Sequence, residues 1–158
     1  MKQSTSRRQF LKTTGAVLGA GVWVATRGDV LSAAASVSPN ERLSVGVIGV
    51  AHRGRANVNE LLGVKSAKIV AVCDVDENNL DDVAQVCPDA KQYTDFRKML
   101  EAEKGLDAVL VATADHCHAP ASLMALNLGK HVYCEKPLTH NVFEARRVTE
   151  AAAKNKRV

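Results

Sequence analysis

Short apolar segments alternate with amphipathic segments over residues 43–158. Segments typical of β-strands lie at 43–49, 67–74, 106–113 and 131–135, and a short fifth strand is expected at 91–93. Between them, apolar side chains recur three or four residues apart, which is the spacing of one helix face. Apolarity within the strands is continuous rather than alternating, which predicts strands buried on both faces. We therefore expect an α/β fold with a doubly wound, parallel sheet.

Residues with known positional preferences mark the helix ends. Gly63 follows the first predicted helix as a C-cap. Thr94 is expected to be the N-cap of the third helix, with Asp95 near the positive end of that helix. Asn141 and Glu144 resemble a capping box that opens the last helix. These signals place the helices between the predicted strands.

The first 35 residues have the pattern of an export signal. Arg7 and Arg8 precede an uncharged stretch at 13–26, which is shorter than the ~20 residues of a membrane span. Small residues ending at Ala35 form an A-x-A cleavage pattern. Paired arginines identify the twin-arginine pathway, so the expected partner is its translocase and the expected location is the periplasm. The alternative is a basic amphipathic N-terminal helix.

Charge gives no support for a nucleic-acid partner. The chain has 21 basic and 17 acidic residues, a net charge of +4 and a pI near 9.0. Residues 1–35 hold five of the basic residues and one of the acidic residues, which leaves 16 of each sign in the remainder. The basic pI therefore belongs to the signal, and no basic patch with interleaved aromatic residues is present.

After the signal, the sequence predicts a short linker and one domain. Residues 36–42 are the linker, and 43–158 are long enough to bury one hydrophobic core. Val158 would begin a further strand that a six-stranded dinucleotide-binding sheet needs, so we expect the domain to be incomplete. The four cysteines are expected to be free thiols, because Cys73 and Cys134 lie in apolar segments.

The segment VGVIGVAHRGR resembles a dinucleotide-binding turn with one glycine replaced. Glycines there let the backbone approach a diphosphate at a helix N-terminus, and Ala51 stands at the middle glycine position. Asp74 lies 25 residues beyond Gly49, close to the spacing of a ribose-binding carboxylate, and it would repel a 2′-phosphate. An ordinary strand-to-helix joint is the alternative. The predicted cofactor is NAD rather than NADP, and the predicted contacts are Gly49, Ala51, His52, Arg53, Gly54 and Asp74.

Two further segments follow predicted strands. In ATADHCHAP, at 112–120, the clustered side chains suggest metal ligands, but no partner cluster at zinc-like spacing occurs, so a ligand crevice is favoured. In GKHVYCEKPLT, at 129–139, Lys136 could orient a substrate hydroxyl and exchange its proton, with Glu135 holding the lysine. A solvated lysine is the alternative. The candidate cofactor-binding residues here are Thr113, Asp115, His118, Glu135 and Lys136.

Together, VGVIGVAHRGR, AVCDVD, VATADHCHAP and GKHVYCEKPLT resemble the glucose-fructose oxidoreductase / inositol dehydrogenase / MocA family. The resemblance covers 43–158, and its EKP motif is the most specific part. It implies a Rossmann fold, NAD(P), a sugar or polyol substrate, and a catalytic role for Lys136 beside the nicotinamide. Ala51 and Asp115 depart from the family pattern, in which Asn is common at the latter position. The resemblance also implies a second α/β domain that supplies substrate contacts, and we expect no part of 43–158 to form it.

Three hypotheses follow from the resemblance. In the first, the chain is the nucleotide-binding part of an exported NAD-dependent sugar or polyol oxidoreductase, which could be a homo-oligomer in its full-length form. In the second, it belongs to an NAD-dependent glycosidase of the same fold, a branch that tends to lack the EKP lysine. In the third, it is a non-catalytic nucleotide-binding module.

Overall fold

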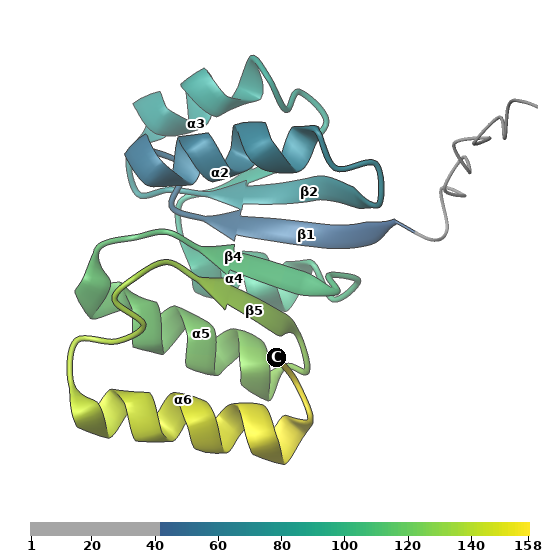
Figure 1. Ribbon diagram of the computed structural model, residues 1–158. Helices are drawn as coiled ribbons and strands as arrows, with labels where there is room; N and C mark the ends of the chain where they lie inside the picture. The colour runs from purple at the N-terminus through teal and green to yellow at the C-terminus, as the bar shows by residue number, and fades with distance from the viewer. Residues whose placement is uncertain (1–41) are drawn as a thin grey trace, which may run out of the picture. The chain divides into compact units, whose positions relative to one another are not determined.

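The computed structural model describes residues 42–158, so the predicted signal and the linker up to residue 41 lie outside the described residues. Figure 1 shows strands and helices alternating along this part of the chain. None of its helices is long and apolar enough to cross a membrane. The elements are β1 Leu43–Ile48, α2 His52–Leu62, β2 Ala67–Cys73, α3 Glu77–Ala84, β3 Lys91–Tyr93, α4 Phe96–Ala102, β4 Ala108–Val111, η2 Asp115–Cys117, α5 His118–Asn127, β5 His131–Cys134 and α6 Val142–Asn155.

The five strands form one parallel sheet, which confirms the predicted fold class. Their order is β3-β2-β1-β4-β5, and every neighbouring pair is parallel. The chain moves outward from β1 to β3 and then returns to the other side of β1 with β4. The carboxyl ends of β1 and β4 therefore meet at the point where the strand order reverses, and ligands of open α/β sheets bind at this point.

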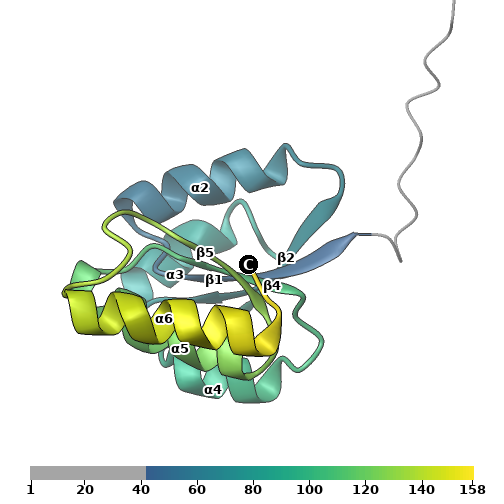
Figure 2. The same cartoon turned by 60° about the horizontal axis from the view of Figure 1, so that its bottom comes forward.

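Helices cover both faces of the sheet, which explains the continuous apolarity of the central strands. Val47 of β1 belongs to a core cluster with residues of α2 and α3. Its neighbour Ile48 belongs to a second cluster with residues of α4 and α5. Successive strand residues point to opposite faces, so both must be apolar. Figure 2 shows α2 above the sheet and α4, α5 and α6 below it.

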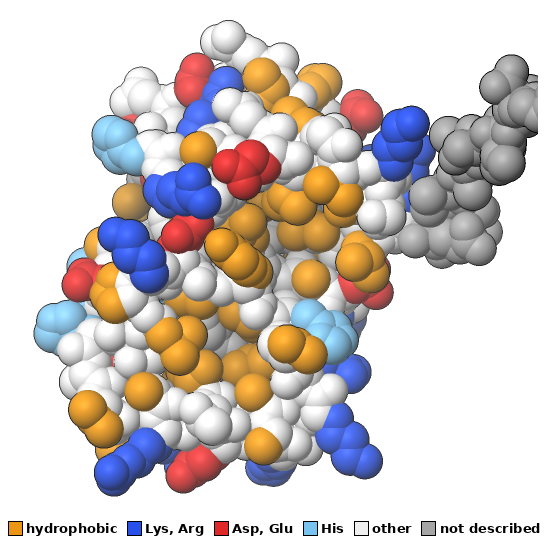
Figure 3. Space-filling model, viewed as in Figure 1, with side chains coloured by type: hydrophobic (Ala, Val, Ile, Leu, Met, Phe, Trp, Pro, Cys, Tyr) orange, Lys and Arg blue, Asp and Glu red, His pale blue; other side chains and the backbone are white. Residues whose placement is uncertain are grey.

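The edge strand β5 is an exception to the predicted burial on both faces. His131 and Tyr133 are exposed, and the exposed fraction of Tyr133 is 57%. The crossover helix after β4 packs on the face opposite α2, so nothing in the described part of the chain covers β5 on the α2 side. Figure 3 shows hydrophobic side chains gathered there. These side chains line a groove, and they include Leu43, Val45, Leu61, Val64, Leu110 and Tyr133.

The helix caps agree with the sequence at all but one of the predicted positions. Asn141 accepts a hydrogen bond from Glu144 N at 2.9 Å, and the Glu144 carboxylate accepts one from the backbone before it, as in a capping box. Gly63 is the C-cap of α2. The prediction that Thr94 caps α4 is wrong: Asp95 is the N-cap, and its carboxylate accepts from Arg97 N at 2.9 Å.

The end of the chain lies beside the sheet edge. The carbonyl oxygen of Val158 accepts a hydrogen bond from Val132 N of β5 at 2.7 Å. This bond gives Val158 the position that the first residue of a further strand beside β5 would have.

Candidate functional site

A pocket of about 680 Å³ lies at the carboxyl ends of the strands, where the strand order reverses. Residues that follow β1, β2, β3 and β4 line it, as expected for the ligand crevice of an open α/β sheet. Six of the predicted site residues are among them, although they come from three separate segments of the chain. These six are Gly49, Ala51, His52, Arg53, Asp74 and Thr113.

Two glycines of the turn between β1 and α2 have no room for a side chain. Gly49 has φ +84°, and a Cβ there would lie 2.6 Å from the carbonyl oxygen of Ala112. A Cβ on Gly54 would lie 2.0 Å from the carbonyl oxygen of Gly49. The turn is therefore packed tightly against both β4 and the first turn of α2. Close packing of this kind leaves the backbone of the turn open to the pocket.

Ala51 occupies an ordinary backbone conformation, which explains why this position does not need glycine. Its φ is −87° and its ψ is 163°, an extended conformation that any residue adopts. After Gly49, the next left-handed residue of the turn is His52, with φ +44°. Ala51 is also the N-cap of α2, but its side chain forms no cap hydrogen bond. The free N–H groups of the first turn of α2 are thus suited to an anion.

Asp74 joins the end of β2 to this turn. One carboxylate oxygen accepts a hydrogen bond from Val50 N at 2.9 Å. The other accepts from Asp76 N and from Asn79 Nδ2, both at 3.1 Å. These bonds fix the orientation of a carboxylate on the pocket wall, where it can accept hydrogen bonds from ribose hydroxyls and repel a phosphate.

The segment after β4 is divided between the pocket and the core. Thr113 lines the pocket, whereas Asp115 is exposed at the start of η2 and is not part of the lining. His118 is 2% exposed, and its Nδ1 and Nε2 lie 2.6 Å from Pro137 O and 3.0 Å from Thr113 O. Both ring nitrogens therefore contact backbone carbonyls. This gives His118 a structural contact between two loops in place of the predicted contact with a cofactor.

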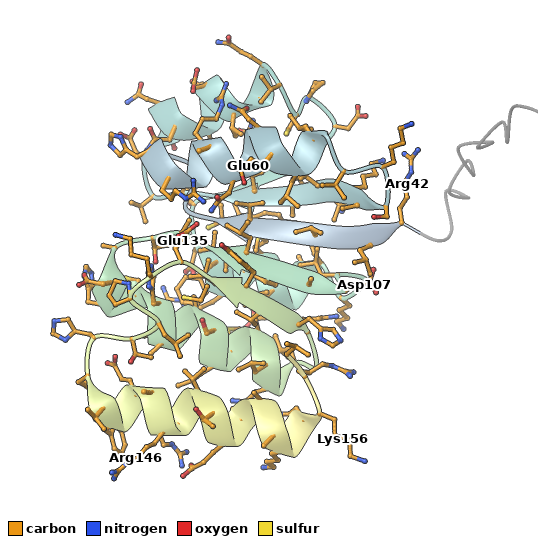
Figure 4. The ribbon with its side chains drawn as sticks, in the orientation of Figure 1. Arg42, Glu60, Asp107, Glu135, Arg146 and Lys156 are labelled. Atoms are coloured by element: carbon orange, nitrogen blue, oxygen red, sulfur yellow. The ribbon has the colours of Figure 1, made fainter. Side chains whose placement is uncertain are left out.

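The loop after β5 differs from the sequence interpretation in one respect. Lys136 is exposed and follows β5 closely, but Glu135 does not hold it. The Glu135 carboxylate instead accepts hydrogen bonds from Arg53 Nε at 2.9 Å and Asn57 Nδ2 at 2.8 Å, both on α2. The bonds from Asn57 and Arg53 hold the pKa of the Glu135 carboxyl below its ordinary value. Figure 4 shows Glu135 between α2 and the strand ends.

Comparison with known proteins identifies the fold and its ligand. Residues 43–158 match the model of the GFO/IDH/MocA oxidoreductase family, with an NAD-binding Rossmann fold. The chain belongs to this family. The resemblance expected from the EKP motif and the glycine turn is thereby confirmed, as is NAD as the cofactor of the family.

Three proteins illustrate the match. An inositol 2-dehydrogenase of Salmonella typhimurium is 30% identical over 115 residues, which are 72% of this chain and 34% of that protein. A glycosyl hydrolase family 109 protein of Saccharopolyspora erythraea is 32% identical over an alignment of 174 residues, covering 96% of this chain and 38% of that protein. The crystal structure of GenD2 from gentamicin A biosynthesis in complex with NAD has a TM-score of 0.70 and 27% identity, covering 85% of this chain and 36% of that chain. The chain thus spans about a third of the length of these relatives.

The residues present fit the NAD of this family. At Gly49 and Gly54 the turn has no space for a side chain. Glycines at such positions let the backbone approach a diphosphate closely. The Asp74 carboxylate lies at the end of the second strand, where a ribose-binding acid is expected.

Among residues 42–158, no group of three His, Cys, Asp or Glu side chains is arranged to hold a metal ion.

Sequence reasoning missed several residues of the pocket. They lie at or beyond the carboxyl ends of β2 and β3, where only Asp74 was predicted to belong to the site. Cys73 lies at the pocket wall, and burial raises the pKa of its thiol to about 12, which favours the protonated thiol at neutral pH. All four cysteines are free, as predicted. Among the missed lining residues are Val75, Asn79, Thr94 and Phe96.

Proposed function

We propose that the chain is the NAD-binding part of an oxidoreductase that acts on a secondary alcohol of a sugar or polyol. The observation that carries this proposal is the pocket at the reversal of strand order, with the glycine turn on one wall and Asp74 on another. A relative named inositol 2-dehydrogenase supports a polyol as the substrate class.

Different residues of the pocket would bind different parts of NAD. The turn from Gly49 and the first turn of α2 would hold the diphosphate, because their N–H groups and the helix dipole favour an anion. Asp74 would hold the hydroxyls of the adenosine ribose, which favours NAD over NADP. Thr113, which follows β4, would bound the nicotinamide side of the pocket.

Lys136 is proposed to move the proton of the reaction. Bound NAD supplies a hydride acceptor at the nicotinamide C4. When a secondary alcohol is oxidised, its carbon loses a hydride and its hydroxyl loses a proton, and the Lys136 amine in its neutral form would take that proton. The reverse reaction returns the proton to the carbonyl oxygen. The exposed position of Lys136 just after β5 leaves it accessible to a substrate.

A second candidate function is glycoside hydrolysis through transient oxidation by the same NAD. The alignment with the glycosyl hydrolase family 109 protein covers 96% of this chain, whereas the alignment with the inositol dehydrogenase covers 72%. The first alignment therefore extends into the residues that precede β1. Lys136 in the EKP motif argues for the oxidoreductase.

The paired arginines Arg7 and Arg8 support export as a further part of the proposal. In this view the twin-arginine translocase carries the protein to the periplasm after it has folded around its cofactor. Fusion of residues 1–41 to a reporter that is active only after export tests this, with Arg7→Lys/Arg8→Lys as the control pair.

Titration of the purified chain with NADH tests the cofactor site, with the fluorescence of NADH as the readout. Saturable binding is expected, and the absence of binding would refute both enzyme hypotheses. Assays of the full-length protein with inositol and with an aryl glycoside then separate the two. Cofactor reduction by inositol supports the oxidoreductase, and glycoside cleavage without net reduction supports the glycosidase. NADH binding with neither activity supports a non-catalytic module.

A further inference from the structure

We infer that Glu135 is a positioning residue that fastens the cofactor-binding end of α2 to the segment after β5 that carries Lys136. One oxygen, Glu135 Oε1, accepts hydrogen bonds from Arg53 Nε at 2.9 Å and from Asn57 Nδ2 at 2.8 Å. The inference rests on the proposed function, because it assigns these contacts a role in cofactor binding. We call Glu135, Arg53 and Asn57 the α2 clamp.

The geometry of α2 makes the clamp specific. Arg53 and Asn57 are four residues apart and therefore lie on the same face of the helix. Glu135 approaches that face from the end of β5, and its own N–H donates to Val111 O of β4 at 2.9 Å. The carboxylate is thus attached to the sheet ladder and not to a free loop. Figure 4 shows it facing α2.

Burial indicates that the contact is more than a surface ion pair. Asn57 is 4% exposed, on a helix face that would normally place an apolar side chain against the sheet. The Glu135 side chain is 12% exposed, whereas that of Arg53 is 56% exposed. A buried amide needs a partner, and the carboxylate provides it. Asn57 and Glu135 are therefore the buried members of the clamp, and Arg53 is its solvent-exposed member.

The clamp connects the two ends of the proposed active site. Arg53 lines the pocket beside the turn that would hold the diphosphate. Lys136 is the next residue after Glu135, so the clamp joins α2 to the segment of backbone that carries the lysine. The Arg53 guanidinium also balances the negative charge of Glu135 next to a site for an anion. Loss of the clamp should weaken ligands that carry a diphosphate more than ligands that lack one.

Two variants and a matched control test this in the full chain. Glu135→Gln removes the ion pair, and Asn57→Leu removes the buried amide while keeping the volume similar. Glu60→Gln is the control, because Glu60 also lies near Arg53, at 3.7 Å, but its side chain is 70% exposed. Amide hydrogen exchange of α2 from Arg55 onward, where the N–H groups are hydrogen-bonded within the helix, is measured without ligand, and the affinities for NADH and for adenosine are measured by titration.

The clamp predicts a difference between the ligands. In Glu135→Gln and Asn57→Leu, exchange of the hydrogen-bonded amides of α2 from Arg55 onward should be faster, and NADH affinity should fall roughly tenfold, as for loss of a hydrogen bond to a charged group. Adenosine affinity should change less than twofold. Glu60→Gln should match the unmodified chain in both measurements.

Two results would overturn the inference. Exchange in Glu135→Gln that equals exchange in Glu60→Gln would show that there is no clamp, and this result does not depend on whether the chain binds NADH. Faster exchange with an equal loss of NADH and adenosine affinity would show a structural contact without a role in positioning. Failure of the unmodified chain to bind NADH would refute the proposed function and, with it, the assigned role in cofactor binding.

Discussion

Replacement of Gly54 by alanine tests the packing of the turn that would hold the diphosphate. The added Cβ would lie 2.0 Å from the carbonyl oxygen of Gly49 and 2.8 Å from its carbonyl carbon. Ordinary contacts between such atoms begin near 3.4 Å, and the opposing atoms belong to backbone that cannot rotate away. The turn and α2 must therefore separate by more than 1 Å. The clash is with Gly49, the glycine at which the chain turns after β1.

The expected cost follows from the size of this overlap. Inserting a methyl group into a well-packed interior costs ~1–3 kcal/mol and occasionally more, and a clash with backbone belongs at the upper end. A loss of ~3 kcal/mol lowers the folding equilibrium constant roughly 150-fold. With a denaturant dependence of ~1.5 kcal/mol per molar urea, the midpoint of unfolding should fall by about 2 M.

Urea unfolding followed by circular dichroism measures this, and NADH titration of the folded variant measures the effect on the site. Gly105→Ala is the control, because a Cβ at Gly105 meets no atom within 4 Å. NADH affinity should fall at least tenfold in Gly54→Ala, since a shift of about 1 Å displaces the donors of the turn. If both variants unfold at the same urea concentration and bind NADH equally well, the reasoning about the turn is wrong.

Three further predictions concern single side chains. Asp74→Ser should weaken NADH binding and relax the rejection of NADPH, and unchanged titrations with both would exclude Asp74 as the ribose ligand. In the full-length enzyme, Lys136→Met should abolish alcohol oxidation while leaving the affinity for NADH within about threefold, and undiminished turnover would contradict its role in proton transfer. Hydrogen bonds from Arg97 lower the pKa of Asp95 to about 2 from 3.8, so its contribution to stability is present above pH 4 and is lost as the pH falls toward 2. Urea midpoints of the wild type should therefore fall more steeply over this range than those of Asp95→Asn, and parallel curves would contradict the assignment.

The pattern of apolar residues was sufficient to predict the fold because it reflects burial directly. Continuous apolar strands require cover on both faces, and helices of regular spacing supply it. The pattern was misleading at β5, where His131 and Tyr133 are exposed. No element among residues 42–158 covers these two side chains on the α2 side. Burial of an edge strand depends on topology, which a local pattern does not contain.

Contacts between segments that are distant in sequence limited how much of the site could be predicted from the sequence. The rule that ligands bind at the carboxyl ends of strands placed Thr113 and Asp74 correctly on the pocket wall. It did not separate His118 from them, because the buried position of His118 depends on its contact with Pro137 O in the loop after β5, which is distant in sequence. The partner of Glu135 was also missed. Asn57 is 78 residues away from Glu135 in sequence. An amide on a helix gives no local sign that its hydrogen-bond acceptor follows a distant strand.

Ala51 shows how a motif should be interpreted through the backbone that it requires. Three glycine positions in a fingerprint can be required for three different reasons, and the structure separates them here. Gly49 needs its left-handed φ and close contact, and Gly54 needs only the close contact. At Ala51 the backbone is extended, so a methyl group is compatible with the turn. The left-handed residue that follows is His52, and its conformation carries the strain that a glycine would avoid. Thus His52→Gly, and not Ala51→Gly, is the substitution that should relieve strain in this turn.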